Sequence, residues 1–150
     1  MPRISMVLIV MTLCIGCASP YGGDEVLYKR YLLYAQESVT GDAEGLAERY
    51  FSESMFENVD TKDRAAAGKY LSTHLATVFS HYERLEGRVG CMAINGFDSD
   101  GEPVVVSLLY RNERDIWLVD QMHIAFVEGA DRFSSESICP DEVPAKLFVN

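Results

Sequence analysis

The side chains that we consider first for proton transfer fall into two groups along the chain. Asp120, His123 and Tyr110 belong to segments in which apolar and polar residues alternate. His74 and His81 are seven residues apart in a segment with helical spacing. A histidine near a carboxylate can act as an acid–base pair near neutral pH, because its unperturbed pKa is about 6.5. The simpler interpretation, which we favour, is that these are boundary residues with half-exposed rings.

The histidines and cysteines do not form the patterns that bind metal ions. The histidines lack the paired spacing of helix-borne ligands, and the cysteines lack close doublets. The segment Asp98–Glu102 begins like a calcium loop with alternating oxygens, but the closing glutamate is missing, and a tight turn is expected there instead. We therefore predict neither a metal site nor a cofactor.

The chain is acidic, with 13 lysine and arginine residues against 23 aspartate and glutamate residues and a formal net charge of −10. An acidic surface repels phosphate backbones, and no cluster of basic residues interrupts it, so nucleic acid is not an expected partner. A chain of 150 residues buries enough surface for one self-standing core. We expect one domain whose acidic residues keep it in solution.

The N-terminal segment combines a basic residue, an apolar run and a cysteine. Arg3 precedes the run Met6–Gly16, which is shorter than the roughly 20 residues that span a bilayer. Cys17 closes this run after the small residue Gly16 and is followed by Ala18. This arrangement resembles a bacterial lipoprotein signal peptide.

The resemblance implies cleavage before Cys17, fatty acids such as palmitate on the new N-terminal residue, and attachment to a membrane. Because Ala18 rather than aspartate follows the cysteine, it also implies the periplasmic face of the outer membrane. Residues 1–16 are then the signal peptide, residues 17–23 the lipidated cysteine with a flexible tether, and residues 24–150 the domain. The alternative is a plain secretory signal that is cut after Ala18, which releases the product.

Two thiols, Cys91 and Cys139, remain after processing at the predicted site. Exported proteins retain disulfides, so we predict that these two cysteines pair. Closing a loop between positions 48 residues apart stabilises a fold by about 4 kcal/mol in the chain-entropy model.

The first half of the domain has the apolar spacing of helices. A helix is predicted from Asp24 until Gly41, because apolar residues recur every three or four positions. Asp42 is expected to cap a second helix that ends near Met55. A third and longer helix, which carries both His74 and His81, is predicted over residues 61–85.

After Gly87 the apolar period changes from helical spacing to two, which predicts strands. Two strands are expected over residues 88–94 and 104–111, with a turn at 98–101, and a third over 116–126. In this third strand one face is expected to carry Trp117, Val119, Gln121 and His123, and the other Ile116, Leu118, Met122, Ile124 and Phe126.

Three helices followed by an antiparallel meander, with Tyr110, Trp117 and Val119 across the last hairpin, form an order of elements that resembles the nuclear-transport-factor-two-like (NTF2-like) superfamily. The likeness covers about residues 24–127 and is closest to its small exported lipoproteins without an assigned activity. It implies an α+β fold in which three N-terminal helices pack on a curved, cone-like antiparallel sheet of three or more strands, with a pocket at the open end. Either the tail near residues 145–149 adds a strand, or the pocket is shallow.

Enzymes of this superfamily, such as ketosteroid isomerase and scytalone dehydratase, use carboxylates, tyrosines or histidines inside the cone. The resemblance therefore implies Asp120, His123 and Tyr110 as candidate catalytic residues. We predict instead a binding or accessory module whose partners are the membrane, through the lipid anchor, and an apolar small molecule or an envelope protein. An isomerase or dehydratase and a structural docking protein are the alternatives, and no oligomeric state is predicted.

Overall fold

The structure is a computed structural model that describes residues 25–57 and 61–143. The predicted signal peptide 1–16, the tether 17–23 with Cys17, and the last segment 144–150 lie outside the described residues. Within the described part of the chain, no helix has the length and apolar character needed to cross a bilayer.

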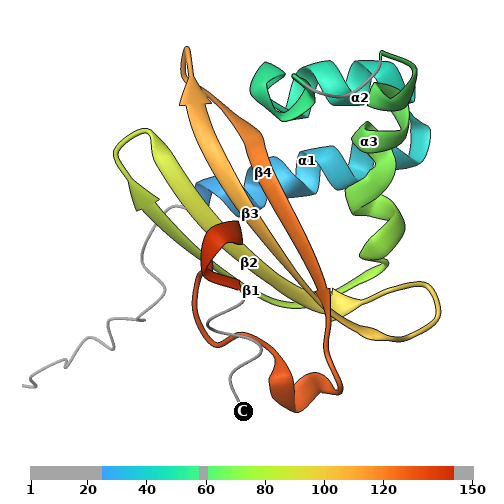
Figure 1. The fold of residues 1–150 in the computed structure, drawn as a ribbon, viewed down its shortest axis with the longest axis vertical. Coiled ribbons are helices and arrows are strands. Elements are labelled where there is room, and N and C mark those ends of the chain that lie inside the picture. The colour runs from blue at the N-terminus through green and yellow to red at the C-terminus, as the bar shows by residue number, and fades with distance from the viewer. Residues whose placement is uncertain (1–24, 58–60, 144–150) are drawn as a thin grey trace, which may run out of the picture.

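The described residues form three α-helices, three short 3-10 helices and four strands. The helical segments are α1 (Val26–Thr40), α2 (Ala43–Tyr50), η1 (Glu53–Phe56), α3 (Thr61–His74), η2 (Ala130–Arg132) and η3 (Pro140–Glu142). The strands are β1 (Thr77–Glu86), β2 (Val89–Phe97), β3 (Pro103–Glu113) and β4 (Ile116–Phe126). They pair in the order β1-β2-β3-β4, every pair antiparallel. The helices pack on one face of the curved sheet and the C-terminal tail crosses the other (Figure 1), which confirms the predicted α+β class.

The predicted third helix is wrong over its second half. Helix α3 ends at His74, and Thr77–Glu86 forms strand β1, which pairs with β2 along its length. β-branched and aromatic residues such as Val78 and Phe79 fit a pleated, half-buried surface, and the free edge of β2 supplies the hydrogen bonds. Tertiary pairing therefore overrides the helical spacing, and the sheet gains a fourth strand without the tail.

Capping residues fix the start of α1 and of α2. The backbone N–H groups of Val26 and Tyr28 each donate to one carboxylate oxygen of Glu83 on β1, both at 2.9 Å. At α2 the predicted cap is confirmed, because the Asp42 carboxylate accepts from the backbone N–H of Gly45 at 2.6 Å. A carboxylate at a helix N-terminus satisfies free donors and interacts favourably with the helix dipole. Glu83 thus joins the first helix to the first strand.

The helix-covered face of the sheet holds the main core, which is rich in aromatic rings. Tyr34 of α1 packs edge-on against Tyr50 and Phe51 with ring centroids 5.5 and 5.6 Å apart. Its hydroxyl donates to the Gly68 carbonyl at 2.9 Å, so the buried polar end has a partner. Other buried members of this core are Leu27, Tyr31, Leu46, Phe56, Leu71, Met92, Ile94, Val106, Leu108 and Tyr110.

The opposite face carries a smaller cluster made by the sheet and the tail, namely Ala93, Ala125, Ile138 and Val143. The tail crosses this face without forming a strand in residues 127–143. Cys91 on β2 and Cys139 in the tail form a disulfide with their Cα atoms 4.9 Å apart, as predicted. The Ser107 hydroxyl of β3 donates to the Ile138 carbonyl. A covalent bond and buried hydrogen bonds therefore hold the tail on the sheet.

Strand β4 contains a β-bulge at Asp120. Leu109 of β3 pairs with Gln121, whereas Tyr110 pairs with Val119, so Asp120 has no partner in the ladder. The predicted faces of this strand are wrong across the bulge, because the extra residue exchanges the alternation. Trp117 and Val119 pack on the helix-side core together with Met122 and Ile124 beyond the bulge.

Candidate functional site

Asp120 lies in a network of hydrogen bonds that joins β4 to β3 and to the segment after α2. Its carboxylate accepts from the Ser52 hydroxyl at 2.7 Å and from the Ser54 hydroxyl. Its second oxygen forms an ion pair with Arg111 at 2.6 Å. The backbone N–H of Ser52 also donates to the Val119 carbonyl at 2.8 Å, so the bulge and η1 are held side by side.

These partners keep Asp120 ionised. Burial acts to raise the pKa of its carboxyl, but the hydrogen bonds from Arg111, Ser54 and Ser52 and the charge of Arg111 lower it below the ordinary 3.8. An ionised carboxylate with three donors suits the anchoring of a loop. It does not suit a general acid, which has to hold a proton near neutral pH.

The structure does not bring the other predicted candidates into contact with Asp120. His123 pairs with Ser107 in the ladder, and its neighbours Met122 and Ile124 point to the helix side, so the histidine lies on the tail-covered face. Tyr110 is buried in the helix-side core, where burial and the neighbouring Tyr31 raise the pKa of its phenol.

The two remaining histidines lie on different elements, which corrects the expectation that one helix carries both. His74 is the last residue of α3, where its Nδ1 lies 2.8 Å from the Tyr70 carbonyl. His81 is on β1, where its ring stacks on Tyr28 with centroids 3.5 Å apart and its Nε2 lies 3.6 Å from the Glu25 carboxylate. In the described part of the chain, no group of three or more histidine, cysteine or acidic residues is placed to hold a metal ion.

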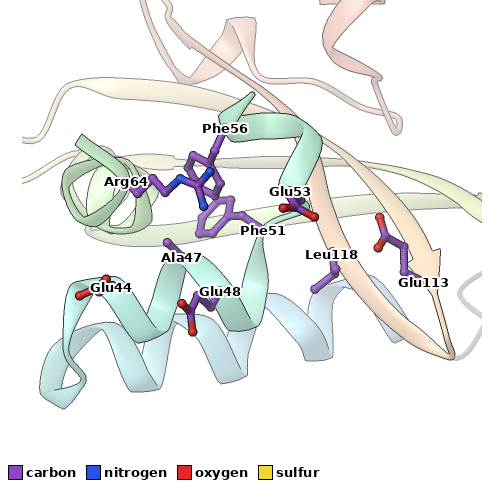
Figure 2. A pocket seen from close by; sticks show the side chains of 9 residues that line it. All are labelled: Glu44, Ala47, Glu48, Phe51, Glu53, Phe56, Arg64, Glu113 and Leu118. Atoms are coloured by element: carbon purple, nitrogen blue, oxygen red, sulfur yellow. The ribbon is translucent and has the colours of Figure 1, made fainter. Parts of the chain in front are cut away.

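A cavity of about 380 Å³ lies between α2, η1, the start of α3 and the β3–β4 hairpin. Its lining residues, labelled in Figure 2, are Glu44, Ala47, Glu48, Phe51, Glu53, Phe56, Arg64, Glu113 and Leu118. The apolar members form its base, where the rings of Phe51 and Phe56 meet at an angle of 64° with centroids 6.0 Å apart. All four glutamates are exposed, so the cavity joins an apolar base to an acidic rim.

Arg64 is the one cation among these lining residues. Its guanidinium carbon lies 5.6 Å from the centroid of the Phe56 ring, within the range of a cation–π contact. Its Nε is buried and has no hydrogen-bond partner among the described residues. A buried donor without a partner costs about 1–3 kcal/mol.

The predicted candidates do not include these cavity residues. The sequence indicates Glu44, Glu48 and Glu53 as the solvated face of a helix, and they are exposed. Their spacing places them on one side of α2 and η1, but nothing in the sequence shows that Arg64 and Glu113 face them. The residues that meet at the cavity are up to 74 positions apart, from Glu44 to Leu118, so the site depends on tertiary packing.

A second hollow of about 320 Å³ lies on the other side of the hairpin tip. It is lined by Val26, Lys29, Arg30, Leu33, Asp115, Ile116 and Trp117. Arg30 bounds this hollow, where its Nε donates to the Trp117 carbonyl at 3.0 Å and its guanidinium carbon lies 4.2 Å from the Tyr50 ring centroid. The second hollow therefore has two cations and one carboxylate, so its net charge is opposite in sign to that of the first cavity.

No family model and no curated protein matches the chain. Its structure is similar to that of a calcium/calmodulin dependent protein kinase II association domain from Xanthomonas campestris, with a TM-score of 0.50 and 12% identity over 75% of this chain and 94% of that chain. It is also similar to an NTF2-like protein with a cystatin-like fold from Novosphingobium aromaticivorans, with a TM-score of 0.48 and 15% identity over 71% of this chain and 82% of that chain. At such identities a likeness shows the fold alone.

Proposed function

We propose that the protein is a binding module that is tethered to the cell envelope through Cys17 and takes a small molecule with an apolar body in the cavity beside α2. The observation that carries the proposal is the cavity itself, about 380 Å³ in volume with an aromatic base. Small-molecule sites are typically apolar hollows of about 300–1,000 Å³ with a few polar groups. The resemblance to NTF2-like lipoproteins supports the same class of function.

The elements around the cavity also support a formed site. Asp120 holds η1 on β4 through Ser52 and Ser54, and Asp42 caps α2. One wall of the cavity is thus fixed to β4 by hydrogen bonds, and the helix that forms another wall is capped at its start. Pre-formed walls lower the ordering cost of binding.

The binding proposal is tested with tryptophol, a neutral indole alcohol, titrated by calorimetry against the full-length protein. A ligand of this size is expected to bind with a Kd of about a millimolar. The variant Leu118→Trp places a large ring in the cavity and is expected to abolish binding. Ile116→Trp, two residues along the same strand but in the second hollow, serves as the matched control and is expected to bind like the wild type. Unchanged binding in Leu118→Trp would contradict the site.

The tether is tested separately by mass spectrometry of the protein made in a Gram-negative host. The expected product lacks residues 1–16 and carries acyl chains at Cys17, and Cys17→Ser is expected to release it from the membrane fraction. An unmodified cytosolic protein that retains its first 16 residues would contradict the anchor. It would leave the cavity proposal standing.

A further inference from the structure

We infer that the cavity beside α2 selects organic cations: molecules with a flat apolar body and one positively charged amine. This inference deepens the proposed binding function and depends on it. The lining carries four glutamates and one arginine, a formal charge of −3 from four minus one. Within residues 25–57 and 61–143, no ion pair or hydrogen bond engages the side chains of these glutamates.

The glutamates come from different elements and meet at one opening. Glu48 lies on α2, Glu53 on η1 and Glu113 at the end of β3. Glu44, in the first turn of α2, has a structural reason for its charge in the helix dipole. Glu53 likewise lies in the first turn of η1, and Glu113 interacts with the charge of Arg111, yet all four carboxylates line one apolar hollow. An amine at this rim would interact with several carboxylates at once.

The base of the cavity suits the apolar body of such a ligand. The guanidinium of Arg64 already lies over the Phe56 ring, so the protein's own cation occupies that end of the cavity. Figure 2 shows Arg64 beside the two phenylalanine rings, and Glu53 and Glu113 at the other end near Leu118. A ligand cation is therefore expected at the end with the two glutamates, away from Arg64, with its apolar body over the rings.

Arg64 argues for the opposite class, an anion, because it brings positive charge to the cavity lining. The net charge of the lining argues against an anion, because the lining holds one arginine and four carboxylates. On this argument Arg64 weakens the binding of a cation. Replacing it with an apolar residue is expected to strengthen such binding, whereas an anion would lose its partner.

Three probes with the same indole ring separate charge from shape: tryptamine, a cation; tryptophol, which is neutral; and indole-3-acetate, an anion. The full-length protein is titrated with each at low salt, and tryptamine is expected to bind about five- to tenfold more tightly than tryptophol. This advantage should fall at high salt, because the Debye length shortens to about 3 Å at 1 M.

Two variants test which residues supply the preference. Glu53→Gln combined with Glu113→Gln is expected to weaken tryptamine binding by about three- to tenfold and to leave tryptophol unchanged. The matched control is Glu102→Gln combined with Glu128→Gln, which removes the same charge from exposed positions outside the cavity lining. Arg64→Leu is expected to strengthen tryptamine binding by about two- to fivefold.

The outcomes separate this inference from the proposed function. Equal binding of the three probes, all abolished by Leu118→Trp, would keep the cavity as a small-molecule site and overturn the preference for cations. Tightest binding of indole-3-acetate, weakened by Arg64→Leu, would also overturn it and assign the cavity to anions. Failure of every probe to bind would contradict the proposed function and the inference together.

Discussion

The two faces of the sheet are covered in different ways. On one face, helices bury large rings and aliphatic side chains such as Leu108 and Tyr110, and the cavity opens at the edge of this layer. On the other face, a tail without regular secondary structure over most of its length covers small residues such as Ala93 and Ala125. A thin cover buries little apolar area, so the tail depends on a disulfide and on hydrogen bonds. Stability on the helix face comes from packing, and on the tail face from discrete bonds.

Removing the disulfide is expected to have the largest effect on the tail face. The variant Cys91→Ser combined with Cys139→Ser should lower the free energy of unfolding by about 4 kcal/mol, measured by denaturant titration. Binding of tryptophol to the native protein should be unchanged, because the cavity is built by the helix face. A loss of binding in the folded variant would show that the two faces are coupled.

Packing on the helix face is tested by Leu108→Ala, since Leu108 is fully buried there. A cavity-forming change of this kind should destabilise the protein by about 3 kcal/mol. The neighbouring Val105, which points to the tail side and is also buried, provides the comparison. Val105→Ala should cost less, about 1.5 kcal/mol, because fewer methylene equivalents are lost. An equal loss of unfolding free energy in the two variants would contradict the conclusion that packing stabilises mainly the helix face.

The sequence predicts most of the elements, but it misses β1 and the faces of β4. Asp42 as a cap and the change to a period of two after Gly87 depend on local chemistry, and both agree with the structure. The prediction of a helix over residues 77–85 is wrong because these residues have both the apolar spacing of a helix and the propensity of a strand. Pairing with β2 selects the strand. The cavity cannot be predicted because Arg64 and Glu113 meet there only through tertiary packing.

The Asp120 network, which fixes one wall of the cavity, gives a prediction that depends on pH. Asp120→Asn should lower the free energy of unfolding by about 2 kcal/mol at pH 7, because hydrogen bonds to a charged acceptor are lost. The folded-state pKa of Asp120 lies below the unfolded value of 3.8. Its contribution is therefore complete well above pH 3.8 and is lost as the pH falls through the lower folded value.

Unfolding curves of the wild type and of Asp120→Asn between pH 2 and pH 7 check this prediction. The difference in the free energy of unfolding between the two proteins should disappear at the acidic end of this range. A difference that stays constant from pH 2 to pH 7 would mean that the effect of the substitution does not arise from the charge of Asp120. Ser54→Ala removes one of the donors to Asp120. Its free energy of unfolding should differ less from that of the wild type, with the same dependence on pH.

The smallest expected effect concerns a single hydrogen bond on the tail face. Ser107→Ala removes the donor to the Ile138 carbonyl and should cost about 1 kcal/mol. Hydrogen exchange should become faster in residues 134–143 and stay unchanged in α1 and α3. Faster exchange in the helices would contradict the separation of the two faces.

The bulge at Asp120 makes the first half of β4 sensitive to the number of residues as well as to their types. Deleting Asp120 would restore an uninterrupted ladder and leave the other pairs in place, because Val119 already pairs with Tyr110 and Gln121 with Leu109. Trp117 would stay on the helix side, but the carboxylate that holds Ser52 and Ser54 would be lost. Sequence comparisons along this strand therefore need to align insertions and deletions before they compare residue types.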